Sequence, residues 1–345
     1  MGLRSEIFEQ PEVLARLLER ERATVMAVAR AVRRRDIASV FLAARGSSDN
    51  AGLYAKYLWG ARNRLPVALA APSLFTIYQS PPVIKDMLVV GISQSGQSPD
   101  IVSVICEGRR QGALTLAITN NPASPLAQAA ELVLDTAAGP EEAVAATKSY
   151  TTQLLAVAMV SQALSGEGDA LPQLGKIPNQ VRQALTLDPD IERLAEHHHD
   201  ATHCVVLGRG YNYATAFEWA LKLKELARVV AEPYSSADFQ HGPVALVSQG
   251  FPVLALAPDG AVFPELLSLL STLVNEHQVE LVAVSDRDEV LSLAHAALRI
   301  PPGVPEWLSP VVCIVPAQLF CYHLTRAKGY DTENPRGLQK ITSTW

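Results

Sequence analysis

The sequence lacks the features that mark nucleic-acid-binding, membrane-spanning and secreted proteins. Its 345 residues contain 29 Lys and Arg against 35 Asp and Glu, with no basic block, so we expect no nucleic-acid partner. No unbroken apolar run reaches the length that a membrane span needs, so we also expect no membrane partner. Residues 1–6 lead into a polar helical pattern rather than the apolar centre of a signal peptide, which favours a cytoplasmic location.

Cysteine is scarce, and its spacing indicates neither a disulfide framework nor a zinc site. Cys106, Cys204, Cys313 and Cys321 are scattered among apolar neighbours and show neither spacing, so we expect reduced thiols in the core. The three histidines at 197–199 are consecutive, and consecutive residues fan around a helix instead of converging on one ion. We therefore predict a solvated helix end there, and no metal.

The chain repeats its apolar runs at an offset of roughly 165 positions, which indicates the duplication of a whole domain. The paired runs are 39–46 with 203–210, 87–92 with 252–256, 113–118 with 280–285, and 132–135 with 297–300. Helical patterns such as 100–111 and 263–277 alternate with these runs. This alternation predicts an α/β fold in which helices cover both faces of parallel sheets.

The repeat sets the expected domain boundaries. Residues 1–35 form a helical lead-in, residues 36–165 the first domain and residues 191–325 the second. The proline-containing stretch 166–190 is expected to be a linker, and residues 326–345 a polar C-terminal tail. In such sheets, ligands bind beyond the carboxyl ends of the strands.

One strand end carries an unusual concentration of hydroxyl groups. The apolar run 87–92 leads into Ser93-Gln94-Ser95-Gly96-Gln97-Ser98, and Pro99 then suits the first turn of a helix. Free backbone N–H groups, the helix dipole and the serine hydroxyls together favour a phosphate. There is no Walker lysine and no G-x-G-x-x-G motif, so a nucleotide is not the obvious ligand. A ligand-free helix cap is the alternative interpretation.

Charged residues are also grouped on one helical segment, 218–226. Glu218, Lys222 and Glu225 fall at i, i+4 and i+7 and therefore share a face. Apolar residues surround this stripe, so we expect the helix to be buried with its charges facing a cleft. A carboxylate beside a lysine in a cleft is a candidate general base. His241, in a nearby loop, is either a structural hydrogen-bonding residue or a catalytic partner.

Six segments, in order along nearly the whole chain, resemble the sugar isomerase (SIS) family, and in particular the isomerase half of glucosamine-6-phosphate synthase. They are 93–96 (Ser-Gln-Ser-Gly), 144–148 (Val-Ala-Ala-Thr-Lys), 205–210 (Val-Val-Leu-Gly-Arg-Gly), 220–225 (Ala-Leu-Lys-Leu-Lys-Glu), 241–246 (His-Gly-Pro-Val-Ala-Leu) and 335–340 (Pro-Arg-Gly-Leu-Gln-Lys). The resemblance implies two tandem SIS domains, each a five-stranded parallel sheet flanked by helices in a flavodoxin-like, three-layer arrangement.

The resemblance also implies roles for individual residues. The sugar phosphate would be held by Ser48, Ser93, Gln94, Ser95 and Ser98, with Val144, Ala146 and Gln339 lining the sugar. Glu225 would move a proton between C1 and C2, with Glu218 and Lys222 beside it. His241 would assist ring opening and would come from the neighbouring subunit of a homodimer. Lys340 would approach the carbonyl carbon and can form a Schiff base. No cofactor is implied.

The chain departs from the synthase pattern in two places. It begins without the glutaminase domain and has no cysteine before Cys106, so we expect no glutamine chemistry from this chain alone. The turn Arg45-Gly46-Ser47-Ser48 differs from the synthase's Cys-Gly-Thr-Ser and resembles stand-alone members of the family.

The leading hypothesis is therefore an amino-sugar phosphate isomerase/deaminase that converts glucosamine 6-phosphate to fructose 6-phosphate and ammonia. The alternatives are a synthase-type isomerase without its glutaminase, a deglycase of fructosyl-amino acid 6-phosphates, and a non-enzymatic sugar-phosphate sensor.

Overall fold

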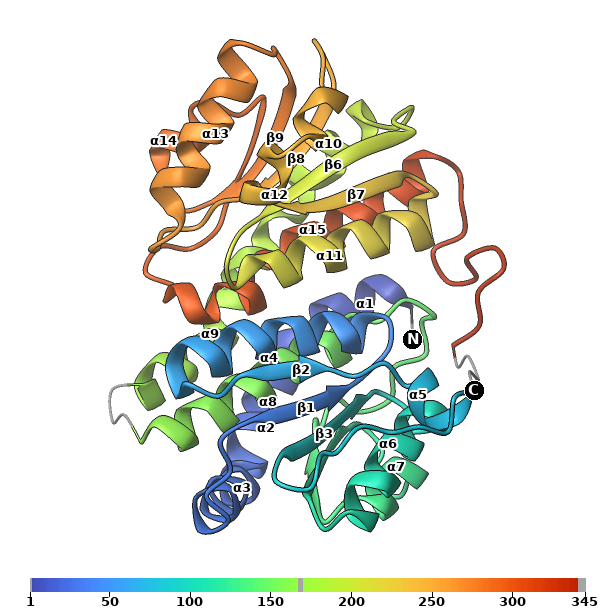
Figure 1. Ribbon diagram of the computed structural model, residues 1–345. Coiled ribbons are helices and arrows are strands. Elements are labelled where there is room, and N and C mark those ends of the chain that lie inside the picture. The colour runs from blue at the N-terminus through green and yellow to red at the C-terminus, as the bar shows by residue number, and fades with distance from the viewer. Residues whose placement is uncertain (1, 167–169, 341–345) are drawn as a thin grey trace. The chain divides into compact units, whose positions relative to one another are not determined.

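The computed structural model describes residues 2–166 and 170–340. The chain divides into two compact units, each with its own sheet (Figure 1). The N-terminal unit comprises Glu12–Glu141, Lys148–Gly175 and Gln339–Trp345. The C-terminal unit comprises Met1–Pro11, Glu142–Thr147 and Lys176–Leu338.

The sheet of the N-terminal unit has five parallel strands in the order β2-β1-β3-β4-β5. The strands are β1 (Val40–Ala43), β2 (Val67–Leu69), β3 (Leu88–Ser93), β4 (Leu114–Thr119) and β5 (Leu132–Asp135). Every residue of β1, β3 and β4 is buried, because helices cover both faces. Phe41 packs with residues of α6 (Pro99–Arg110) and α7 (Pro125–Ala129), whereas Leu42 meets Gly52 of α4 (Ser47–Asn63) on the other face.

The sheet of the C-terminal unit repeats this topology, in the order β10-β9-β8-β6-β7. Its strands are β6 (His203–Gly208), β7 (Val230–Ser235), β8 (Pro252–Leu256), β9 (Glu280–Ser285) and β10 (Ala296–Arg299). One face packs against α13 (Phe263–Asn275), and α11 (Asn212–Lys222) and α15 (Ser309–Ala327) lie on the other (Figure 1). In both sheets the first strand lies between the second and the third, which is the flavodoxin-like order. The predicted duplication and α/β fold class are therefore confirmed.

The remaining elements are helices outside the sheets. They are α1 (Leu3–Phe8), α2 (Gln10–Arg20), α3 (Arg22–Arg34), α5 (Ser73–Thr76), α8 (Lys148–Ser165), α9 (Ala170–Ala184), α10 (Asp188–His197), α12 (Ser236–Gln240) and α14 (Asp288–Leu291), the short 3₁₀ turns η1 (Leu185–Leu187), η3 (Pro243–Leu246) and η4 (Glu306–Leu308), and the π-helical turn η2 (Leu223–Ala227). The stretch expected to be a linker is therefore helical over 170–190. Pro189 is compatible with a helix because it lies in the first turn of α10, where no N–H is needed. Pro178 lies inside α9.

Two expectations about individual side chains are wrong. Cys106 is exposed on α6, while the other three cysteines are buried, and burial raises the pKa of the Cys204 thiol to about 12. His198 is also buried, with Nδ1 3.0 Å from the Leu194 carbonyl oxygen and its ring edge-on to Phe320. The 197–199 run is therefore a helix end of which only part is solvated.

One helix of the C-terminal unit is both long and apolar. Among the described residues, the stretch Glu306–Ala327 is long and apolar enough to cross a bilayer, but 94% of its most apolar window is buried inside the structure. It packs against α10 and α11, as the core helix of a globular domain does.

Candidate active site

Two turns meet at the carboxyl edge of the first sheet, because β1 and β3 are neighbouring parallel strands. The turn after β1 leads into α4 and the turn after β3 leads into α6. Arg45 Nε donates to Asp100 Oδ2 over 2.8 Å, and the Asp100 side chain is fully buried at the start of α6. This ion pair ties the two turns together. Burial raises the pKa of Asp49, in the first turn of α4, while Arg45 opposes part of that rise.

The 93–98 turn has the geometry of a tight, donor-rich loop. Gly96 has φ +63°, and a Cβ there would lie 2.1 Å from Ser124 Oγ, so only glycine fits without rearrangement. Ser93 Oγ accepts the Gly96 N–H over 3.1 Å, and Ser95 Oγ accepts the Gln97 N–H over 3.3 Å. Each hydroxyl that accepts a bond still has its own proton to donate, so the turn suits an anion.

A polar pocket of about 510 Å³ lies at this turn, within the N-terminal unit. It is lined by Gln94, Ser95, Gln97, Asn120, Asn121, Glu141 and Lys340. Gln94, Ser95 and Lys340 were predicted from the sequence. Ser48, Ser93, Ser98 and Gln339 belong to the same unit but do not line this pocket; Ser48 Oγ instead accepts a hydrogen bond from Gln153 Nε2.

Sequence reasoning did not assign Asn120, Asn121 or Glu141 to the site, and it included Gln97 only as part of the 93–98 turn. Asn120 follows β4, the strand next to β3, so the rule that ligands bind at the carboxyl ends of parallel strands could have found it. Its Nδ2 donates to Gly139 O over 2.8 Å, and its Oδ1 accepts the Ala138 N–H over 2.9 Å. Asn120 therefore holds the segment that leads to Glu141.

Glu141 and Lys340 form an ion pair on the wall of this pocket. Lys340 Nζ donates to Glu141 Oε2 over 2.9 Å. The carboxylate is fully buried, whereas the Lys340 side chain is 25% exposed. A lysine amine therefore borders the pocket beside the hydroxylated turn.

The charged stripe of the C-terminal unit lies where α11 changes to a π-helical turn. Lys222 ends α11, and Glu225 lies in η2. Lys222 Nζ is 2.5 Å from Glu225 Oε2 and 3.5 Å from Glu218 Oε1. Glu218 and Lys222 are buried, while the Glu225 side chain is 24% exposed. Single π turns occur frequently at functional sites, and here the turn carries the one carboxylate of the stripe that solvent can reach.

The other candidates of the C-terminal unit lie on loops. His241 is exposed directly after α12. Val144 and Ala146 belong to the segment Glu142–Thr147, which α1 holds in place: Glu6 Oε1 accepts the backbone N–H of Glu142 over 2.5 Å. Among the residues that the structure describes, no three His, Cys, Asp or Glu side chains are grouped so that they could hold a metal ion.

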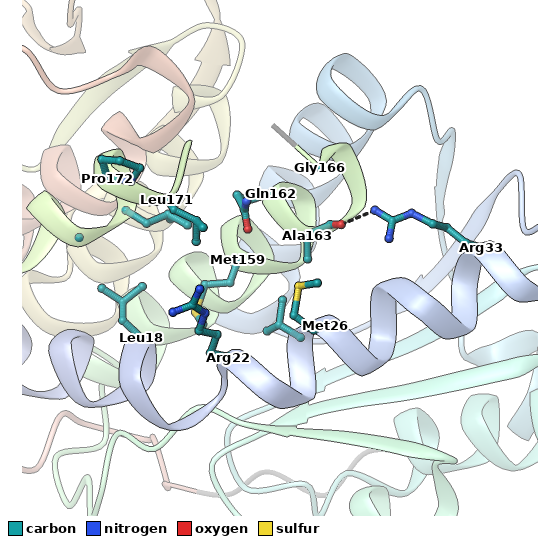
Figure 2. A pocket seen from close by; sticks show the side chains of 13 residues that line it. Leu18, Arg22, Met26, Arg33, Met159, Gln162, Ala163, Gly166, Leu171 and Pro172 are labelled. Atoms are coloured by element: carbon teal, nitrogen blue, oxygen red, sulfur yellow. Dashed lines mark hydrogen bonds between the residues drawn. The ribbon is translucent and has the colours of Figure 1, made fainter. Parts of the chain in front are cut away.

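A second cavity of the N-terminal unit, of about 680 Å³, is apolar (Figure 2). It lies between α2 and α3 on one side and α8 and α9 on the other. Met26, Met159 and Leu171 line it, and Arg33 Nη2 is bonded to the Ala163 carbonyl oxygen at its edge. It offers no carboxylate, hydroxyl or imidazole for chemistry, so the polar pocket is the candidate site.

Comparison with known proteins places the chain in a family that has this fold. The model of the SIS domain matches residues 35–163 and 198–327, so the chain belongs to the SIS-domain family. The sequence is 35% identical over 345 residues to a glutamine–fructose-6-phosphate aminotransferase (isomerizing) of Thermococcus kodakarensis, covering 97% of this chain and 56% of that protein. A Thermus thermophilus protein of the same name is 34% identical, covering 97% and 57%. The chain thus spans little more than half the length of these curated relatives.

Solved structures agree with this assignment. A candidate phosphosugar isomerase from Silicibacter pomeroyi superposes with a TM-score of 0.86 at 34% identity, covering 96% of this chain and all of the other. The C-terminal domain of glucosamine-fructose-6-phosphate aminotransferase from Francisella tularensis gives 0.85 at 29% identity, covering 96% and 98%. A glucosamine-6-phosphate deaminase from Thermotoga maritima gives 0.79 at 21% identity over the whole of both chains and shares the fold. The chain is a member of the phosphosugar isomerase family.

Proposed function

We propose that this chain interconverts glucosamine 6-phosphate plus water and fructose 6-phosphate plus ammonia. The observation that carries the proposal is the Glu218–Lys222–Glu225 array, in which a partly exposed carboxylate is bonded to a buried lysine. A carboxylate held in this way suits proton transfer between adjacent carbons of a sugar. The serine-rich turn and the polar pocket suit the phosphate group, whose binding energy orients the reacting carbons.

In the proposed reaction, Glu225 removes the proton from C2 of the open-chain aldose and returns it to C1. The C2 amine loses a proton and the C1 carbonyl oxygen gains one, so that the amine becomes an imine. Water then adds to C2 and ammonia leaves, which gives the ketone. Lys222 fixes the Glu225 carboxylate through its ammonium group. Lys340 contacts the carbonyl end of the substrate, and Val144, Ala146 and Gln339 line the sugar. His241 assists ring opening.

His241 requires a second copy of the chain in this proposal. Its exposure on the described surface leaves it accessible to another molecule. We propose a cytoplasmic homodimer in which each copy completes the other's site, since an isologous contact provides two such sites at once.

The direct experiment incubates the protein with glucosamine 6-phosphate and measures ammonia and fructose 6-phosphate. The Glu225→Gln variant should lose roughly 10²–10⁴-fold in kcat, the range typical of a general base. Glu276→Gln makes the same chemical change at an exposed position of the same unit and should leave kcat unchanged. Equal rates of ammonia release from the wild-type protein and Glu225→Gln would reject the proposal.

The synthetic direction is a second candidate, which the names of the curated relatives favour. Fructose 6-phosphate with added ammonia would then give glucosamine 6-phosphate at the same site. A panel of fructosyl-amino acid 6-phosphates tests the deglycase alternative. Binding of sugar phosphates without turnover of any of them would instead indicate a sensor.

A further inference from the structure

The Glu141 carboxylate is held by two hydrogen bonds from Ser149 in addition to its ion pair with Lys340. Its Oε1 accepts the Ser149 backbone N–H over 3.0 Å, and its Oε2 accepts the Ser149 hydroxyl over 2.7 Å. Ser149 lies in the first turn of α8, where the helix dipole also favours a negative charge. A buried carboxylate with these partners is a fixed point in the N-terminal unit.

The position of this carboxylate is unusual for an anion site. Glu141 lines the same pocket as Gln94 and Ser95 of the hydroxylated turn, and an unpaired negative charge there would repel a phosphate. Lys340 Nζ, 2.9 Å from Glu141 Oε2, compensates that charge. Each partner therefore needs the other: the carboxylate fixes the amine, and the amine makes the carboxylate compatible with an anionic ligand.

A lysine side chain without a partner does not keep its amine at one place on a pocket wall. This long side chain has about 2 kcal/mol of rotamer entropy to lose on being fixed. Here the amine comes from the C-terminal segment that begins at Gln339, and it reaches a carboxylate 199 positions earlier in the chain. The pair thus sets where the amine stands at the pocket wall.

We propose that Glu141 is a positioning residue that acts through Lys340, holding its amine where it faces a sugar phosphate in the polar pocket. The inference rests on the proposed function for its substrate, but the held amine is a property of the chain alone. Two measurements therefore separate the two ideas: chemical reactivity of Lys340, which needs no substrate, and kinetics, which do.

The first measurement is acetylation of lysines by a water-soluble succinimidyl ester, followed by peptide mass spectrometry. Exposed Lys85 of the same unit serves as the internal reference. In Glu141→Gln, which keeps the shape of the side chain but not its charge, Lys340 should react at least threefold faster relative to Lys85. An unchanged ratio means that Glu141 does not hold the amine and overturns the inference.

The second measurement is a double-mutant cycle with glucosamine 6-phosphate. Glu141→Gln should lower kcat at least tenfold with KM within threefold of the wild-type value. Lys340→Met should also weaken binding of fructose 6-phosphate, and adding Glu141→Gln to it should restore part of that binding while lowering kcat no further. Independent, multiplicative losses in kcat would overturn the inference, since residues acting as one unit are non-additive.

Two further variants exclude a general structural effect. Glu131→Gln removes the carboxylate of an exposed ion pair with Arg35 in the same unit and should change neither measurement. Ser149→Ala removes one anchoring hydrogen bond and leaves the ion pair in place, so it should change kcat less than Glu141→Gln. A wild-type chain without any turnover would reject the proposed function, while the acetylation ratio would still decide the role of Glu141.

Discussion

Replacing Lys222 by methionine tests whether the charged residues of α11 and η2 stabilise one another. The Lys222 side chain is 3% exposed and lies between the carboxylates of Glu218 and Glu225. Methionine keeps most of the volume but removes the cation. Glu218, whose side chain is fully buried, then loses a compensating positive charge. Breaking a buried pair in this way costs about 3–5 kcal/mol.

The effect is measurable as a thermal midpoint. For a unit of 150–250 residues each kcal/mol corresponds to about 2–4 °C, so Lys222→Met should lower Tm by roughly 6–20 °C. Lys224→Met, the same change at an exposed lysine of the same turn, should stay within about 0.5 kcal/mol of wild type. It is the matched control.

The double variant Glu218→Gln/Lys222→Met gives the sharper criterion. Because it removes the buried carboxylate along with the cation, it should recover part of the lost stability. If Lys222→Met melts within 2 °C of wild type, or if the double variant is less stable by the sum of the two single losses, the three side chains do not form a coupled group. The assignment of Glu225 as a base supported by Lys222 would then lose its physical reason.

Two further substitutions probe the fold around the sites. Gly96→Ala places a Cβ 2.1 Å from Ser124 Oγ at a φ of +63°, and the left-handed conformation alone costs about 1–2 kcal/mol. Both the Tm and the affinity for fructose 6-phosphate, measured by calorimetry, should therefore fall. An unchanged affinity would mean that this turn does not take part in phosphate binding. Asp188→Asn tests the interaction of Asp188 with His323 and Arg4. Burial raises the pKa of Asp188, but hydrogen bonds from His323 and Arg4 lower it by more, so the net pKa lies below its usual value. The interaction therefore stabilises the protein above the unfolded-state pKa of about 3.9, and this contribution is lost as the pH falls through the folded value. The Tm difference between wild type and Asp188→Asn should be largest near neutral pH and shrink in acid, and a difference that grows in acid would contradict the sign.

The strands that carry the fold could be predicted because they are buried on both sides. β3 and β4 are mostly apolar and buried at every position, and the sequence repeats this pattern in β8 and β9. The two strands that sequence reasoning missed are β2 and β7, each at a sheet edge. β2 has three residues, and β7 contains Glu232 and Pro233 with alternating exposure. Edge strands tolerate proline and charge, so they lack the signal that marks a central strand.

The candidate site was predictable only where it is local in sequence. The stripe of Glu218, Lys222 and Glu225 follows from helical spacing, and the 93–98 turn from its hydroxyls. The partnership of Glu141 with Lys340 joins residues 199 positions apart, and no periodicity reports such a contact. Glu141 itself resembles an ordinary acidic residue near the start of a helix, which the helix dipole explains without any site.

The duplicated topology allows the strand-end turns of the two sheets to be compared directly. In the C-terminal unit, β8 and α13 occupy the places that β3 and α6 have in the N-terminal unit. The turn between them, Ala257-Pro258-Asp259-Gly260, has no hydroxyl side chain. Glu306 instead reaches this turn: its Oε2 accepts the Ala261 N–H over 2.9 Å, and a Cβ on Gly260 would lie 2.3 Å from its carboxyl carbon.

A carboxylate of the chain itself thus accepts the Ala261 N–H of this turn, whereas in the first copy serine hydroxyls accept the N–H groups of Gly96 and Gln97. The second copy instead places charged side chains on the helix after its first strand, where α11 and η2 carry Lys222 and Glu225. The proposed function thus assigns anion binding to the strand-end turn of the first copy and proton transfer to α11 and η2 of the second.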